Sequence, residues 1–340
     1  MTIKKLKAAI LFLVLFSALF VVKADLYAGE EILKTFKNVT LVKLETFSGD
    51  CVVKKGTGSD VKVRYVYSGL GTGKEPKFLQ EGSMLMVKEK LHFSGSGSSN
   101  WYLTVPEKTG IKFKSVSGDF SVEGLKSEIS VETVSGDVEA EDCSGDIFLS
   151  SVSGDFEVQK LSGKVQVKSA SSDLEVEKLF GEIQVKSASG DIEAEELVGT
   201  IVLKVASGDI DIDNSQGRFE VKTASGDISA SNIIIKEKSR FKVASGDIYV
   251  KLGQSAAHDL TLDSASGDAV LNYNGNPIEG YFEFKALDES GKIVSPFGFD
   301  REEEDERWGK KYLIKSFKRK SSTPRILIYT ASGKAALKEK

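Results

Sequence analysis

Short segments of alternating apolar and polar residues run through the middle of the chain, for example residues 191–195 and 200–204. Alternation with a period of two predicts β-strands that bury one face. Segments of about five residues are too short to form stable helices. Residues 107–276 contain no proline, as expected for strands whose N–H groups must all bond to neighbouring strands.

The segments recur with a period of 18 residues that divides into two halves of nine. A Ser-Gly-Asp tripeptide opens most units, and Ser172 takes the one place in the regular block where its glycine is missing. The glycines expected at structural turns are Gly118, Gly136, Gly154, Gly190, Gly208, Gly226, Gly246 and Gly267. A second set of small residues lies halfway between turns: Ser127, Gly145, Gly163, Gly181, Gly199 and Gly217.

A period this short is typical of a repeat architecture. A strand, a turn, a second strand and a second turn return the chain to its start, displaced by one strand spacing of ~4.8 Å. We therefore predict an all-β fold, a two-sheet parallel β-solenoid (β-helix) with 18-residue coils made of two 9-residue halves. Stacking would align apolar residues into two facing columns, one running from Phe120 to Ile228 and the other from Ile111 to Phe219.

The pattern divides the chain into four parts. They are a signal peptide at 1–24, irregular N-terminal β coils and a cap at 25–106, the regular solenoid at 107–275, and a C-terminal β cap with acidic and basic stretches at 276–340. Gly49 and Gly58 are nine residues apart, which predicts coils of the same kind in the N-terminal part. Both flanks are expected to cover the unpaired edges of the solenoid.

The first 24 residues have the features of a secretory signal peptide. Lysines at positions 4, 5 and 7 precede an uncharged apolar run over residues 8–22, and Ala24 follows as part of a small-residue cleavage site. The apolar run has 15 residues, fewer than the ~20 that a spanning helix needs. We expect an exported protein that is periplasmic, on the cell surface or secreted.

Charge and cysteine content exclude two classes of protein. Removal of residues 1–24 takes away four lysines and no acid, so the formal charge moves from -4 to -8. A mildly acidic protein has no general attraction to nucleic acid. Cys51 and Cys143 are too few for a disulfide framework, and both occupy apolar positions of the repeat.

Catalytic motifs are absent from the sequence. His92 and His258 are far apart and have no companion at metal-ligand spacing, and there is no nucleophile elbow, phosphate loop, CxxC pair or HExxH. The sequence therefore predicts no enzymatic activity. A carbohydrate-active β-helix enzyme is the disfavoured alternative, because it requires acids clustered around a groove and here they are spread evenly along the repeat.

The aspartates of the repeated tripeptide should form a row along one edge of the solenoid. They are Asp119, Asp137, Asp155, Asp173, Asp191, Asp209 and Asp227. One interpretation is a row of Ca²⁺ ligands, as in calcium-binding β-rolls, whose nonapeptide repeat is G-G-x-G-x-D. We favour a structural role in which Gly supplies a positive φ while Ser and Asp bond the N–H groups of their own turn. On this interpretation the protein needs no cofactor or metal.

The outward positions of the two sheets carry opposite charges. On the first sheet, whose strands follow Ser-Gly-Asp, the acidic row consists of Glu139, Glu157, Glu175, Glu193 and Asp211. On the second sheet the lysine row consists of Lys168, Lys186, Lys204, Lys222 and Lys242, with Lys114 nearer the N-terminus. Rows of this kind can simply maintain solubility. They can also bind a charged envelope polymer, glycan or protein, or mediate side-by-side self-association.

One stretch resembles a known family. Trp101-Tyr102-Leu103-Thr104-Val105-Pro106, followed by Ile111-Lys112-Phe113-Lys114-Ser115-Val116-Ser117-Gly118-Asp119, is similar to the DUF4097 family of bacterial candidate adhesins. The resemblance covers about residues 31–275 and implies an exported β-solenoid of the bacterial envelope, without binding residues to transfer. Together with the charge rows it predicts a non-enzymatic adhesion or binding scaffold.

Overall fold

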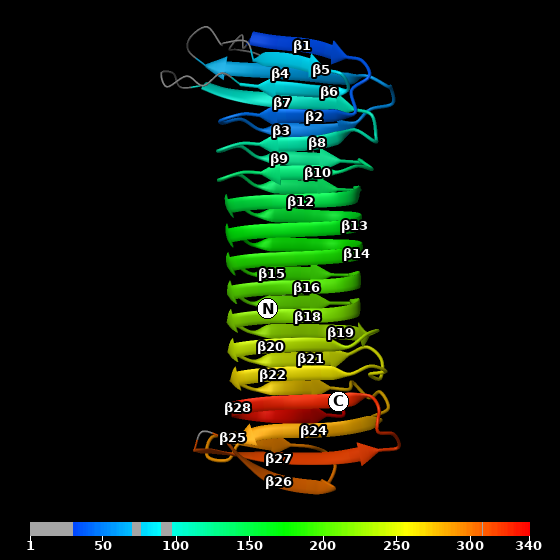
Figure 1. The fold of residues 1–340 in the computed structure, drawn as a ribbon, viewed down its shortest axis with the longest axis vertical. Helices are drawn as coiled ribbons and strands as arrows, with labels where there is room; N and C mark the ends of the chain where they lie inside the picture. Colours follow the sequence, from blue (N-terminus) through cyan, green and yellow to red (C-terminus); the bar gives the residue numbers. More distant parts are fainter. Residues whose placement is uncertain (1–29, 70–75, 90–96, 308) are drawn as a thin grey trace.

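The computed structural model describes residues 30–69, 76–89, 97–307 and 309–340. The predicted signal peptide and His92 lie outside this part of the chain. The described residues form a β-solenoid of about nine turns with coils of ~18 residues, and no helix among them is long and apolar enough to cross a membrane. Figure 1 shows the coils stacked along the long axis, so the predicted two-sheet solenoid is confirmed.

The first sheet contains the strands that follow each Ser-Gly-Asp corner. It is formed by β3 (Cys51–Lys55), β7 (Gly97–Val105), β9 (Phe120–Glu123), β11 (Val138–Glu141), the first halves of β13 (Phe156–Ser171) and β14 (Leu174–Ser189), β15 (Ile192–Glu195), β17 (Ile210–Asp213), β19 (Ile228–Ile235), β21 (Ile248–Leu252), β23 (Ala269–Asn272) and the second half of β28 (Arg325–Lys338).

The second sheet contains the strands that lead into each corner. It is formed by β2 (Leu41–Glu45), β6 (Met84–Lys88), β8 (Gly110–Lys114), β10 (Ile129–Glu132), β12 (Ser144–Ser153), the second halves of β13 and β14, β16 (Val198–Ser207), β18 (Gln216–Ser225), β20 (Ser239–Ser245), β22 (Leu260–Ser266), the first half of β28 and β24 (Gly280–Leu287).

The strands pair in parallel, and each residue pairs with the equivalent residue of the next repeat. Equivalent residues therefore stack directly. Leu174 pairs with Ile192, which pairs with Ile210. The two predicted apolar columns face each other between the sheets and are buried throughout. The core is therefore a thin layer of aliphatic and aromatic side chains along the whole axis, stabilised by the burial of apolar surface in every coil.

The glycines halfway between corners lie inside long strands. Gly163 pairs with Gly145 and Gly181 within β12, β13 and β14, and the ladder of strand pairing continues past them. All three have positive φ values. The chain turns from the first sheet to the second over residues such as 160–163, where Lys160 and Gly163 both have positive φ values, and strand pairing resumes at Leu161.

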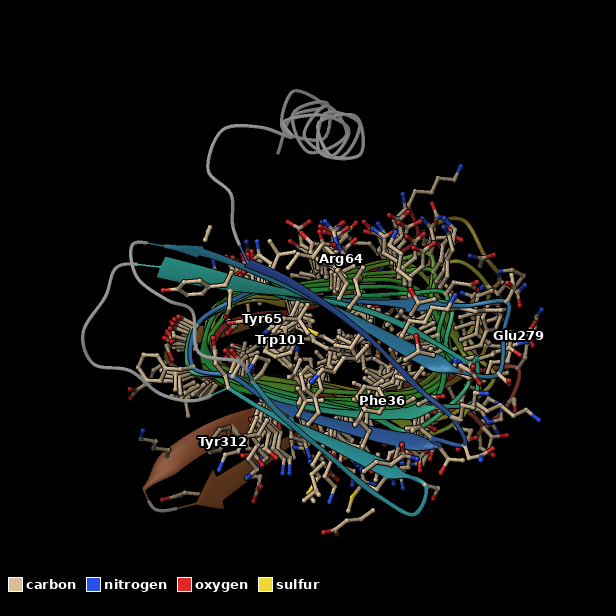
Figure 2. All side chains as sticks on the ribbon, turned by 90° about the horizontal axis from the view of Figure 1, so that it is seen from above. Phe36, Arg64, Tyr65, Trp101, Glu279 and Tyr312 are labelled. Carbon is tan, nitrogen blue, oxygen red and sulfur yellow. The ribbon has the colours of Figure 1, made fainter. Side chains whose placement is uncertain are left out.

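The N-terminal end is interleaved rather than sequential. β2 lies between β6 and β8, and β3 lies between β7 and β9. Outside this coil, β1 (Glu30–Phe36), β4 (Val61–Gly69) and β7 pair antiparallel, as do β5 (Lys77–Glu81) and β6. Tyr65 and Trp101 pack there with ring centroids 4.5 Å apart (Figure 2). The N-terminal end thus contains two layers that continue both sheets, β2 with β3 and β6 with β7, and the antiparallel strands β1, β4 and β5.

The C-terminal end is interleaved in the same way. β28 pairs with β22 and β23 as the next coil, and β24 and β25 (Gly291–Val294) lie beyond it. β26 (Arg301–Arg307) and β27 (Lys310–Arg319) form an antiparallel hairpin on β24. The acidic and basic stretches are therefore the two strands of one hairpin, joined by ion pairs such as Lys315–Glu302 at 2.8 Å.

The Ser-Gly-Asp corners bring the backbones of successive coils unusually close. The corner glycines have φ values from +113° to +153°. A Cβ added to Gly208 would lie 2.1 Å from the carbonyl oxygen of Gly190, a distance at which the backbone itself must move. Glycine is therefore favoured at these corners both by conformation and by space, and Ser172, at the one corner without it, does not have a positive φ.

We predict that Gly208→Ala lowers the free energy of unfolding by at least about 2 kcal/mol, because it combines a disfavoured φ with a backbone clash. Gly58→Ala is the matched control, since Gly58 has open space around its Cβ position and no positive φ. It should change stability by less than about 0.5 kcal/mol. Urea unfolding of both variants measures the difference. Equal stability of the two variants would contradict this account of the corners.

Candidate functional site

The corner aspartates form a continuous hydrogen-bonded ladder, here called the Asp ladder. The backbone N–H of Asp137 donates to Oδ1 of Asp119 at 2.9 Å, and the N–H of Asp155 donates to Oδ1 of Asp137 at 2.9 Å. The same bond joins Asp50–Asp119, Asp155–Asp173, Asp173–Asp191, Asp191–Asp209, Asp209–Asp227, Asp227–Asp247 and Asp247–Asp268 at 2.7–3.0 Å.

The Asp ladder differs from the expected bonding within each turn. Each carboxylate accepts from the next coil, so it satisfies a donor that would otherwise have no backbone acceptor at the corner. The ladder ends where Lys334 takes the place of an aspartate. Its N–H donates to Asp268 at 2.8 Å, and its Nζ pairs with the same carboxylate at 3.1 Å. The aspartates therefore join coils as well as shaping turns.

One oxygen of each ladder aspartate is thus committed to an N–H group. Successive carboxylates belong to successive coils, so each coil contributes only one remaining carboxylate oxygen to the Asp ladder. Among the described residues, no group of three or more His, Cys, Asp or Glu side chains is arranged to hold a metal ion.

A second periodic corner was not predicted from the sequence. Six polar residues 18 apart adopt left-handed backbone angles, with φ values of +51° to +57°: Asp142, Lys160, Lys178, Glu196, Asn214 and Asn232. Each directly precedes an inward-facing residue such as Leu161 or Leu197. Asp142 and the asparagines at 214 and 232 are the signal in the sequence, since Asp and Asn tolerate this conformation better than Lys or Glu.

The acidic row is in exact register on the first sheet. Glu139 pairs with Glu157, then Glu175, Glu193 and Asp211, each directly opposite the next. Partial burial, together with the neighbouring carboxylates, raises the pKa values of Glu157, Glu175 and Asp211. No member of the row forms an ion pair within the described residues. The row is a line of uncompensated negative charge.

The neighbouring outward positions on the same sheet add further acids, which are partly compensated. Glu141 and Glu177 belong to this second line. Lys160 pairs with Glu141 at 2.6 Å, and Lys178 pairs with Glu177. Both lysines sit at the left-handed corners, so the first sheet keeps its excess negative charge mainly along the acidic row.

The lysine row is also in register on the second sheet. Lys168, Lys186, Lys204, Lys222 and Lys242 pair in sequence. Lys204 pairs with Glu220 and Lys242 with Asp263, while the other three form no ion pair among the described residues. Lys114 does not continue the row, because Glu132 and Ser150 lie between it and Lys168.

A concave region of about 480 Å³ lies on the second sheet at the N-terminal end of the lysine row. Its lining includes Lys114, Phe148, Ser150, Gln166 and Lys168. Lys168 belongs both to this region and to the lysine row. The lining also includes Glu132, which pairs with Lys114 at 2.7 Å. The region is open to solvent and offers an aromatic surface beside polar groups and Lys168.

The remaining candidate residues do not form a site. Cys51 and Cys143 are buried free thiols, and burial raises the pKa of both. His258 is exposed in the segment between β21 and β22. None of these residues takes part in the charged rows.

Comparison with known proteins identifies a family. Residues 44–289 match the family model described as Toastrack DUF4097. No curated protein matches the chain. A crystal structure of a candidate cell adhesion protein from Clostridium sporogenes is 12% identical, with 92% of this chain and 100% of that chain covered and a TM-score of 0.22. At this level of similarity the match says nothing about what this chain binds.

We predict that Asp191→Ala destabilises the protein by about 1 kcal/mol, because the N–H of Asp209 loses its acceptor. Asp191→Asn keeps an oxygen acceptor and removes one charge from the Asp ladder, so it should be at least as stable as the wild type. Thermal melts with and without EDTA should coincide for all three proteins. A melting temperature that falls on EDTA addition would show instead that a metal ion stabilises the row.

We further predict that the acidic row makes stability depend on pH. Because the folded-state pKa of Glu175 is raised, its contribution to stability is complete below the unfolded pKa of about 4.3 and is lost as the pH rises through the folded value. Glu175→Gln should therefore stabilise the protein by about 0.2–1 kcal/mol at pH 7 and by nearly nothing at about pH 4. Denaturant unfolding at both pH values measures this, with the exposed Glu289→Gln as control. A pH-independent gain would refute it.

Proposed function

Because the chain belongs to the Toastrack DUF4097 family, whose fold here is a rigid stack of minimal coils, we propose that it is an exported, non-enzymatic binding scaffold. Its second sheet binds an anionic polymer of the cell envelope through the lysine row. The binding surface of the protein is then the face of the second sheet rather than a pocket or a loop.

The observation that carries this proposal is the register of the lysine row. Parallel stacking places five ammonium groups on adjacent strands, at a spacing of ~4.8 Å along the axis. Lys168, Lys186 and Lys222 form no ion pair among the described residues. A linear polymer with closely spaced phosphate or carboxylate groups can follow such a row and bind many ammonium groups at once.

The concave region extends the same surface. Phe148 and Gln166 lie beside Lys168, so a bound polymer would meet an aromatic surface and an amide at one end of the lysine row. Aromatic faces and amides are suited to sugar or backbone units between charges. This favours a polymer with organic units between its anionic groups.

Export and the absence of enzymatic activity are parts of the same proposal. Export is supported by the lysines and the apolar run of residues 1–24. The non-enzymatic role is supported by the even spread of carboxylates along ladders, because glycoside hydrolysis needs two acids on either side of one bond. The structural role of the Asp ladder, rather than the calcium-roll alternative, is supported by the N–H group that each ladder aspartate accepts from the next coil.

Binding of inorganic polyphosphate, used as a model polyanion, tests the proposal. The variant Lys168→Gln/Lys186→Gln/Lys222→Gln should bind it at least about tenfold more weakly than the wild type, because each lysine near an anionic surface contributes up to ~1 kcal/mol. Fluorescence anisotropy of labelled polyphosphate at low ionic strength measures the affinity.

The matched control is Lys108→Gln/Lys236→Gln/Lys238→Gln, which removes the same charge from exposed positions outside the row. It should bind nearly as well as the wild type. Equal losses in the two variants would mean that net charge alone governs binding, and absence of binding by the wild type would reject the lysine row as a polyanion site.

A further inference from the structure

The acidic row and the lysine row have the same length and spacing but lie on opposite sides of the molecule. Each consists of five residues on adjacent strands of a parallel sheet. Figure 2 looks down the axis and shows the sheets on either side of the core, with Arg64 of β4 on the side of the first sheet and Tyr312 of β27 on the side of the second. The rows therefore cannot pair within one molecule.

Each row is unfavourable in an isolated molecule. Like charges directly opposite each other on neighbouring strands destabilise a sheet. The five acids have no ion-pair partner among the described residues, and neither do Lys168, Lys186 and Lys222. An opposite charge brought to either row from outside would relieve this repulsion.

Both rows flank the same edge of the solenoid. Glu193 lies three residues after the corner glycine Gly190, and Lys186 lies four residues before it. The same offsets hold at the next corner, where Asp211 follows and Lys204 precedes Gly208. The rows thus run at nearly the same distance from the Ser-Gly-Asp edge, one on each face.

We propose that a second copy of this chain docks side by side, with the lysine row of one molecule against the acidic row of its neighbour. Because both rows flank the same edge, translation of a parallel copy without rotation brings the rows face to face. With no axial shift, Lys168, Lys186 and Lys204 lie near the level of Glu175, Glu193 and Asp211. A shift of between one and two coils, ~5–10 Å, brings all five pairs together.

This contact is heterologous, so it does not close into a dimer. The pair still has one free acidic row, on the first molecule, and one free lysine row, on the second, so further copies can add at both sides. The product is an open lateral array of parallel solenoids. Such an array would present a continuous surface made of their Ser-Gly-Asp edges.

The contact should be weak and sensitive to salt. A strand face of four residues is ~13 Å wide, and five coils span ~20 Å along the axis. This area is well below the ~800 Å² per partner of a standard interface. Association should therefore be seen at ~0.01 M ionic strength, where the Debye length is ~30 Å, and disappear near ~1 M, where it is ~3 Å.

Sedimentation velocity of the full chain with two charge-reversed variants tests the proposal. The acid-reversed variant is Glu157→Lys/Glu175→Lys/Glu193→Lys, and the lysine-reversed variant is Lys186→Glu/Lys204→Glu/Lys222→Glu. At low ionic strength the wild type should form species larger than dimers as its concentration rises. Each variant alone should stay monomeric, and a mixture of the two should associate again, because each then offers the other a complementary face.

Four results would overturn the proposal: a wild type that is monomeric at all salt concentrations, growth that stops at a dimer, association retained by either variant alone, or a mixture that stays monomeric. Circular dichroism verifies folding. If a reversed variant does not fold, Glu175→Gln/Glu193→Gln replaces it and should weaken association at least fivefold. The acid-reversed variant keeps the lysine row intact, so polyphosphate binding by this variant separates failure of self-association from failure of the proposed function.

Discussion

The structure depends on the close stacking of identical corners. At each Ser-Gly-Asp corner the glycine has a positive φ, and its Cα faces the carbonyl oxygen of the adjacent coil so closely that an added Cβ would clash. The aspartate beside it accepts the N–H of the next aspartate. These two contacts fix the axial position of each coil against its neighbour, and the register of both sheets follows from them.

Exact register aligns charges as strictly as it aligns the core. The stacking that places Ile192 on Ile210 also places Glu193 on Asp211 and Lys186 on Lys204. In an ordinary antiparallel sheet, opposite charges on adjacent strands can relieve each other. Here the repeat places like charges on adjacent strands. Their mutual repulsion can therefore be reduced only by the corner lysines, by a ligand, or by another molecule.

Much of the fold could be predicted because the repeat is nearly free of exceptions. Period-two alternation and an 18-residue spacing leave few architectures besides a two-sheet solenoid, and the positions of the charge rows follow from the same frame. The bonding of the Asp ladder could not be predicted. A hydrogen bond within the turn and a hydrogen bond to the next coil both place an aspartate at the same position of the repeat, so the sequence does not distinguish them. The interleaving of β2 and β28 depends on pairing between segments more than 60 residues apart along the chain, which periodicity does not encode.

The interleaved ends matter because a stack of coils is vulnerable at its termini. In a sequential solenoid the last coil contacts one neighbour and can separate from it alone. Here β2 and β3 lie between two pairs of strands, as do the halves of β28. Neither coil can separate from the stack without breaking the strand pairing on both of its sides. Among the described residues β26 pairs only with β27, and its almost uninterrupted charge opposes further strand addition at that edge. Growth along the axis is therefore disfavoured at the C-terminal end, whereas the side faces, with their unrelieved charge rows, stay open to contact.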